Sequence, residues 1–181
     1  MKRRALYPGT FDPVHYGHLD LMRRAGLIFD ELVVGVYEHR RPSKSVLFTV
    51  DERRKMIEDA LAAMNGQGHN ISTVPFSGLT VDLARELGIP VIVRGLRVFS
   101  DFEFEFRFAL ANRRMAPSVE TVNLITREEH TFLSSTTVRE IASLGGDVSS
   151  MVPPNVAEAL YRRYQDMDES HSLRQSPPLR D

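Results

Sequence analysis

Short apolar runs alternate with amphipathic runs along most of the chain, and this alternation constrains the fold more than any other feature. The strand-like runs are residues 4–7, 31–37, 71–76, 90–95 and 121–126. Between them, apolar residues recur at helical spacing, as in residues 17–29 and 49–64. The run "LVVGV" is nearly all apolar, which is typical of a strand covered on both faces. We therefore predict an α/β fold in which a doubly wound, five-stranded parallel sheet carries helices on both faces.

The composition limits the functions open to the chain. It has 181 residues, of which 42% are hydrophobic and 26% charged, as in one soluble globular domain. A net charge of −1 argues against a bulk polyanion such as duplex DNA, so we predict no nucleic-acid partner. No apolar stretch approaches the roughly 18 residues of a membrane span or the pattern of a signal peptide, so we predict no membrane partner. The absence of cysteine excludes thiol chemistry and fits a cytoplasmic location.

Two segments raise questions of organisation. Residues 1–164 are expected to form one domain, and residues 165–181, "QDMDESHSLRQSPPLRD", are polar enough to predict a disordered tail. In residues 99–115, phenylalanines alternate with charged residues, yet several also fit a helical stripe, and we favour a helix. Such a helix must bury more than one face. A subunit interface would do this, and so would a helix wedged inside its own domain.

The stretch "YPGTFDPVHYGH", residues 7–18, suggests an anion-binding corner after the first strand. Gly9 permits a sharp turn, and Gly17 permits close approach to a helix start, whose N–H groups and dipole suit phosphate. Thr10 and His18 add donors. A single histidine is more often structural. A zinc site is favoured less, because the metalloprotease pattern needs two histidines four apart with a glutamate between them, and here they are three apart. The chain has neither a P-loop nor a GxGxxG pattern.

Two motifs carry a family resemblance. "GTFDPVHYGH" resembles the first signature of the nucleotidyltransferase superfamily, GxFDPxHxGH, and "FLSSTTVRE" resembles its second, SSTxxR. They occur in the expected order, on opposite flanks of the alternating strands and helices. Together with "VRGLRVFSDFEFE", they resemble the bacterial phosphopantetheine adenylyltransferases over roughly residues 3–164.

The resemblance implies a Rossmann-like nucleotidyltransferase domain over residues 1–164 that assembles as a homohexamer. Its partners would be ATP and 4′-phosphopantetheine, with Mg²⁺ as cofactor and no metal ligands from the protein. The implied reaction belongs to coenzyme A biosynthesis and transfers AMP from ATP to 4′-phosphopantetheine, giving dephospho-coenzyme A and pyrophosphate. The attack would be direct and in line, with no covalent enzyme intermediate.

The resemblance also implies roles for residues that match the motifs. The implied catalytic residues are Thr10, His18, Lys44 and Arg94. The acceptor would contact Thr10, Lys44, Thr80 and Arg94. ATP would contact Thr10, Phe11, His18, Gly95, Leu96, Arg97, Glu105, His130, Thr131, Phe132, Leu133, Ser134, Ser135 and Thr136. The departures from the family pattern are Phe104, where tyrosine is familiar, Ser45, where a second lysine is often seen, and Thr136, where serine is common.

The residue types fit this chemistry. The acceptor phosphate is already an anionic nucleophile, so positioning and charge stabilisation are the main requirements. Taken alone, Lys44 reads as a solvated loop lysine and "DFEFEF" as packing, and the two signatures together reverse those readings. The alternatives are a nicotinate-mononucleotide adenylyltransferase, a more distant cytidylyltransferase, or a non-catalytic nucleotide-binding protein. The stretch from Arg94 to Glu105 argues against the first, and the joint presence of Thr10, His18, Lys44 and Arg94 argues against the last.

Overall fold

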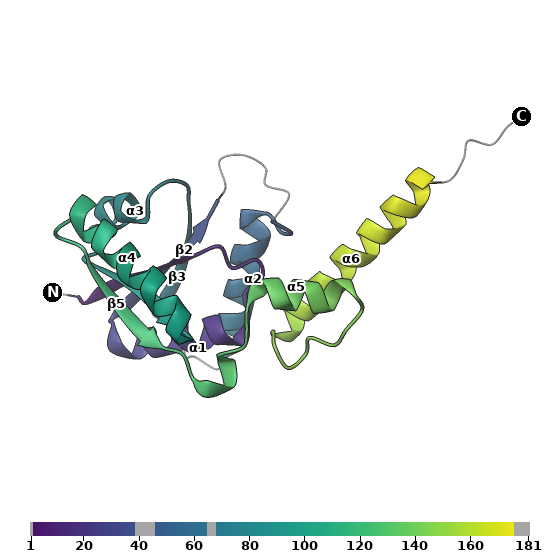
Figure 1. Cartoon of the computed structure of the whole chain (residues 1–181), viewed down its shortest axis with the longest axis horizontal. Coiled ribbons are helices and arrows are strands. Elements are labelled where there is room, and N and C mark those ends of the chain that lie inside the picture. The colour runs from purple at the N-terminus through teal and green to yellow at the C-terminus, as the bar shows by residue number, and fades with distance from the viewer. Residues whose placement is uncertain (1, 39–45, 65–67, 176–181) are drawn as a thin grey trace, which may run out of the picture.

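A five-stranded parallel sheet forms the centre of the molecule in the computed structural model, which describes residues 2–38, 46–64 and 68–175 (Figure 1). The strand order is β3-β2-β1-β4-β5, with every neighbouring pair parallel. The strands are β1 (Arg4–Gly9), β2 (Glu31–Tyr37), β3 (Ile71–Phe76), β4 (Val91–Leu96) and β5 (Glu120–Ile125). The predicted five-stranded α/β fold is confirmed.

Helices cover both faces of this sheet, because side chains of a strand point alternately to its two faces. In β1, Ala5 and Tyr7 join one buried cluster, whereas Leu6 between them joins the other. The first cluster includes residues of α1, α2, α5 and α6, and the second includes residues of α3. The helices are α1 (Tyr16–Ile28), α2 (Val50–Ala62), α3 (Thr80–Glu86), α4 (Phe99–Met115), α5 (Ser135–Ser143), α6 (Pro154–Gln175) and the short 3-10 helix η1 (Glu128–His130).

The ambiguous phenylalanine-rich segment is helical, as predicted, and forms α4 against β4 and β5. Glu105 and Asn112 are buried on its inner side, whereas much of its apolar surface faces outward in the single chain. Phe99 is 92% exposed and Phe104 is 63% exposed. On the neighbouring edge strand β5, Ile125 is 70% exposed, so the exposed apolar surface extends beyond α4.

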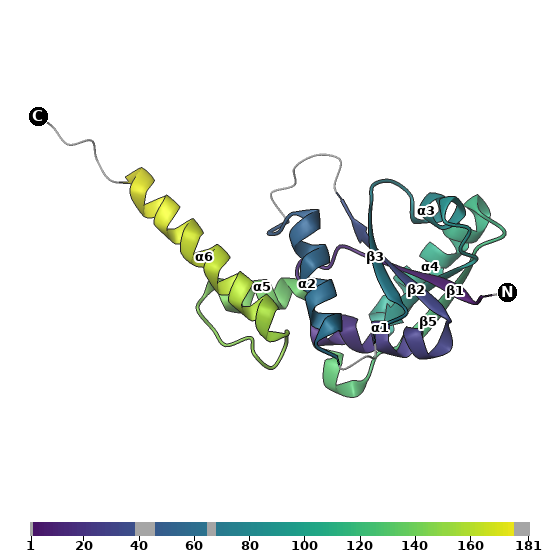
Figure 2. The same cartoon turned by 180° about the vertical axis from the view of Figure 1, so that it is seen from behind.

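The last helix, α6, is longer than the sequence predicted. It continues through Gln175, so residues 165–175 are helical although the whole segment 165–181 was expected to be a disordered tail. Residues 165–175 contain neither glycine nor proline and several good helix formers, which lets the helix propagate from its packed first turns. Figures 1 and 2 show α6 projecting away from the sheet. Residues 176–181 lie outside the described residues.

None of the helices in the described ranges, α6 included, combines the length and the apolarity needed to cross a membrane.

Candidate active site

A cavity of about 320 Å³ opens at the carboxyl ends of β1 and β4. The strand order reverses between these two strands, and ligands of open α/β sheets bind at such a switch point. The cavity is therefore in the position that the sequence predicted for the anion-binding corner. Its lining consists of Tyr7, Pro8, Gly9, Phe11, His15, Gly17, His18, Leu21, Arg94, Gly95, Arg97, Asp101, Glu105, Thr126, His130, Ser134 and Ser135.

The turn after β1 places an aromatic ring beneath the site. Phe11 has φ of 49°, a left-handed conformation that is uncommon for a residue with a side chain. Its ring packs edge-on against Tyr7 and against His18, with centroids 5.3 and 5.0 Å apart. A Cβ on Gly9 would lie 2.7 Å from the Phe11 ring, so glycine is required for this packing. The sharp turn therefore serves to set Phe11 against His18.

The two histidines of the first motif form a reciprocal cap at the start of α1. The backbone N–H of His18 donates to Nδ1 of His15 at 3.3 Å, and the N–H of His15 donates to Nδ1 of His18 at 3.4 Å. Their rings stack with centroids 3.6 Å apart. Because each Nδ1 accepts a hydrogen bond, each neutral ring carries its proton on Nε2, which is then a donor.

Both imidazoles are held in the neutral form. Burial lowers the pKa of His15 from 6.5 to about 3, with a further contribution from the charge of Arg97. Burial also lowers the pKa of His18 well below its usual value, and His15, Arg97 and Arg94 reinforce that shift. The site thus presents two uncharged imidazoles rather than two imidazolium cations.

A second helix terminus faces the same cavity. Ser134 caps α5 by accepting a hydrogen bond from the N–H of Thr137 at 3.1 Å. The hydroxyl of Ser135 donates to the carbonyl of Pro13 at 2.8 Å, which joins α5 to the turn after β1. The amino-terminal ends of α1 and α5 therefore meet at one cavity, and their dipoles both favour an anion there.

The two arginines of the cavity are each paired with an acid from α4. Arg94 binds Glu105 through two hydrogen bonds of 2.9 and 2.7 Å. Burial works to lower the pKa of Arg94, but the hydrogen bonds and charge of Glu105 outweigh it and the pKa is raised. Arg97 binds Asp101 at 3.1 Å and also donates to the carbonyl of Leu133 at 2.9 Å. Arg97 thereby joins the start of α4 to the loop before α5.

The structure brings together many of the residues predicted to contact ATP. Those that line the cavity are Phe11, His18, Gly95, Arg97, Glu105, His130, Ser134 and Ser135. Arg94, predicted as a catalytic and acceptor-binding residue, lines it too. Those outside its lining are Thr10, Leu96, Thr131, Phe132, Leu133 and Thr136. Lys44 lies outside the described residues. Phe104, one of the three departures from the family pattern, is exposed on α4.

Thr80 belongs to a different part of the same sheet edge. It is the first residue of α3, beside a second cavity of about 750 Å³ at the ends of β2 and β3. That cavity is lined by Tyr37, Glu38, Pro75, Phe76, Ser77, Gly78, Leu79, Asp82, Leu83 and Glu86. The two cavities together give the site room for two substrates along one edge of the sheet.

Sequence reasoning missed several lining residues, notably His15, Asp101 and Thr126. A signal for His15 was present, because its spacing of three from His18 is that of a capping box. Asp101 follows Arg97 by four residues, a spacing at which opposite charges pair on a helix. Thr126 carries no comparable signal, since only the sheet register brings it to the cavity.

Comparison with known proteins identifies the class first. The family model described as cytidylyltransferase-like matches residues 6–141, so the chain belongs to this family of nucleotidyltransferases. A bifunctional NMN adenylyltransferase/ADP ribose pyrophosphatase from Francisella tularensis, solved with AMP and a manganese ion, has a similar structure with a TM-score of 0.70. It is 16% identical, and the match covers all of this chain and 58% of that one. At this identity the likeness shows the fold alone.

Relatives with higher sequence identity identify a more specific family within this class. The phosphopantetheine adenylyltransferase of Thermomicrobium roseum is 46% identical over 168 residues, which cover 92% of this chain and 98% of the relative. That of Alkalilimnicola ehrlichii is 49% identical over 160 residues, which cover 88% of this chain and 90% of the relative. The chain therefore belongs to the phosphopantetheine adenylyltransferase family.

The buried histidines predict a pH-dependent stability. His15 has a folded pKa of about 3 against 6.5 when unfolded, so the unfolded chain binds more protons between these values. Its contribution is complete above pH 6.5 and is lost as the pH falls towards 3. In denaturant titrations, His15→Asn, which keeps an acceptor for the cap, should reduce the pH slope of unfolding free energy by up to about 1.4 kcal/mol per pH unit.

Measurements at pH 8 supply the control, because His15 in the parent and Asn in the variant are both neutral there. A difference in unfolding free energy at pH 8 therefore reports packing alone. Parallel curves for the two proteins from pH 8 to pH 5 would contradict the assignment of His15 as a neutral buried imidazole.

Proposed function

We propose that the chain catalyses the transfer of AMP from ATP to 4′-phosphopantetheine, which yields dephospho-coenzyme A and pyrophosphate. The observation that carries this proposal is the identity of 46–49% to phosphopantetheine adenylyltransferases over about nine-tenths of the chain. The cavity at the switch point supports it, because two helix amino termini and neutral imidazole donors suit a triphosphate.

The two cavities suggest how the substrates divide the sheet edge. The triphosphate fits the first cavity, with His18 Nε2–H and the backbone N–H groups at the amino-terminal ends of α1 and α5 as donors. The acceptor arm fits the second, where Phe76 and Leu79 offer apolar contacts and Asp82 can accept from its amide groups. The acceptor phosphate would then lie between the cavities.

The proposed reaction needs no base. A phosphate oxygen of the acceptor attacks the α-phosphorus of ATP, a new P–O bond forms there, and the bond to the β-phosphate bridging oxygen breaks. Pyrophosphate leaves with the bonding electron pair, and no proton has to be removed from the nucleophile. Because His18 is neutral and protonated on Nε2, it can donate to the charge that develops, at no cost of repelling Arg94.

A magnesium ion fits this site as a companion of the nucleotide. No group of three or more histidine or acidic side chains suited to a metal occurs among the described residues. Mg²⁺ usually retains waters and binds through one or two carboxylates plus substrate phosphates, so a dedicated cage is not required. Asp101 and Glu105 are the carboxylates of the cavity lining. The ion would neutralise charge on the triphosphate.

The acceptor itself is the first test. With ATP, magnesium and equal concentrations of 4′-phosphopantetheine and nicotinate mononucleotide, we expect dephospho-coenzyme A to be the dominant product by mass. Nicotinate mononucleotide is included because it would be the acceptor if the chain were the alternative, a nicotinate-mononucleotide adenylyltransferase. Predominance of the nicotinate dinucleotide would overturn the acceptor assignment, and absence of both products would overturn the proposed activity.

His18 gives the second test. We expect His18→Ala to lower kcat about 100- to 1,000-fold, as loss of one preorganised donor does elsewhere. His18→Gln should recover part of that loss, because its side-chain amide N–H can replace Nε2–H. The exposed His69→Ala is the matched control, and circular dichroism checks folding of all three. Turnover of folded His18→Ala equal to that of the control would show that His18 only packs.

The outer surface of α4 supports the predicted homohexamer. Phe99, Phe102, Phe104, Phe106 and Leu110 are each about half exposed or more in the single chain, and such an apolar surface marks an interface.

We expect sedimentation velocity to show a hexamer at micromolar concentration. Phe102→Asp with Phe106→Asp should shift the protein to smaller species, because two buried charges would oppose association. Glu103→Gln on the same helix is the control. An unchanged hexamer in the double variant would show that the interface does not involve this face of α4. A monomeric parent protein would contradict the assembly itself.

A further inference from the structure

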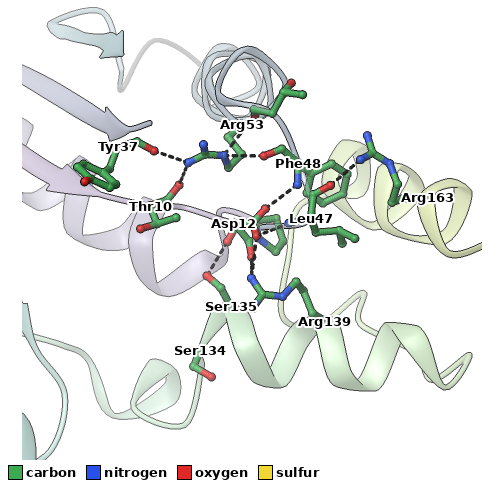
Figure 3. Close-up of polar contacts among 12 residues, drawn as sticks. Thr10, Asp12, Tyr37, Leu47, Phe48, Arg53, Ser134, Ser135, Arg139 and Arg163 are labelled. Atoms are coloured by element: carbon green, nitrogen blue, oxygen red, sulfur yellow. Dashed lines mark hydrogen bonds and ion pairs between the residues drawn. The ribbon is translucent and has the colours of Figure 1, made fainter. Parts of the chain in front are cut away.

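The turn between β1 and α1 is held by side chains from two other helices (Figure 3). On one side, Arg53 of α2 donates to the carbonyl of Thr10. On the other, Arg139 of α5 donates to the carbonyl of Asp12, and Ser135 donates to the carbonyl of Pro13. Three of the four carbonyls in residues 10–13 are thus bound from outside the turn.

Arg53 is an unusual residue for this task. It is 2% exposed, yet each hydrogen bond that the structure gives it goes to a backbone carbonyl. Besides Thr10, these carbonyls belong to Tyr37 at 3.0 Å, Phe48 at 3.0 Å and Thr49 at 3.3 Å. Burying a guanidinium is costly, and burial lowers the pKa of Arg53. A leucine or methionine would fill the space without that cost, so the charge and the fork of donors need a reason.

Asp12 completes the connection. Its carboxylate accepts from the N–H groups of Leu47 and Phe48 at 2.7 and 3.0 Å, and from Arg139 at 2.8 Å. The side chain is 2% exposed. Phe48 is therefore shared: its N–H binds Asp12, and its carbonyl binds Arg53. The two arginines and Asp12 form one connected set, which we call the turn clamp.

The conformation of the turn explains why a clamp is needed. Phe11 has φ of 49°, and a left-handed residue of this kind costs of order 1–3 kcal/mol unless its surroundings impose it. The same turn sets the Phe11 ring against His18 and carries Thr10. Neither Arg53 nor Arg139 belongs to the lining of the cavity, so neither is placed to touch a substrate there.

We propose that Arg53 and Arg139 are positioning residues of the transfer reaction: they hold residues 10–13 from opposite sides, so that Thr10, Phe11 and His18 keep their geometry at the reacting phosphates. This rests on the proposed function for its kinetic consequence. The second signature motif would then have two roles. Its serines Ser134 and Ser135 line the cavity, and its arginine, Arg139, binds Asp12 of the first signature motif. A displacement of about 1 Å at a reacting group can cost about 100-fold in rate, so a small relaxation of the turn suffices.

Lysine substitution tests the clamp, because it keeps the charge but replaces the fork by a single ammonium that cannot reach Thr10, Tyr37 and Phe48 together. We expect Arg53→Lys to lower kcat about 10- to 100-fold while KM for ATP changes less than about 3-fold. Arg54→Lys is the matched control at the adjacent position of α2, where the half-buried Arg54 bonds to Thr73 and, among the described residues, makes no contact with the turn. Arg139→Lys should repeat the pattern of Arg53→Lys.

Amide hydrogen exchange over residues 9–14 supplies a readout that does not depend on activity. It should be faster in Arg53→Lys and Arg139→Lys than in the parent, and unchanged in Arg54→Lys. Lower thermal stability with parental kcat and parental exchange would show a purely structural role and overturn the proposal. A raised KM for ATP with unchanged kcat would also overturn it, because the substitution would then affect binding and not the transfer step. If the parent forms no dephospho-coenzyme A, the proposed function fails, and the exchange data alone decide the clamp.

Discussion

The carboxylate of Asp12 is the contact on which the geometry of the site depends. It is buried, and it accepts hydrogen bonds from Leu47, Phe48 and Arg139. One carboxylate thus joins the end of β1, the approach to α2 and the helix α5, which are far apart in the sequence. Removing it would leave the buried N–H of Phe48 and the partly buried N–H of Leu47 without that acceptor, and an unsatisfied buried donor costs about 1–3 kcal/mol. Because α1 begins directly after this turn, the same contact also determines where His15 and His18 lie.

Among the described residues, the charged side chains that line the cavity are largely paired or neutral. Arg94 is paired with Glu105, Arg97 is paired with Asp101, and both histidines of the cap are neutral. Within the described part of the site, the attraction for a triphosphate therefore comes in large part from the amino termini of α1 and α5, because their dipoles are fixed by the backbone. Such preorganised dipoles stabilise developing charge without having to reorganise during the reaction. The ion pairs fix the two arginines in place. They also weaken non-specific binding of anions to the cavity, because each arginine already has a carboxylate partner.

Local patterns in the sequence predicted the sheet and its helices because each strand and helix shows its own periodicity, and α4 was placed at residues 99–115 correctly. They could not predict that α6 continues through Gln175, because polar composition alone does not distinguish a disordered tail from a solvated helix. The motifs indicated His18 and Ser135, which the cavity brings together. Arg53 was missed because its partners are carbonyls, which every residue has, so no sequence pattern records the contact.

Helix α4 joins the site to the outer surface of the molecule. Glu105 points inward and binds Arg94, whereas Phe104 and Phe106, its neighbours in sequence, are exposed. Arg94 also packs against the ring of Phe108, with its guanidinium carbon 5.4 Å from the centroid, so one helix holds this arginine by charge and by aromatic contact. A partner subunit covering the outer face of α4 would restrict the motion of the same turn of helix that carries Glu105. Assembly through that face would therefore stabilise the Arg94–Glu105 pair, and the proposed interface and the active site share one structural element.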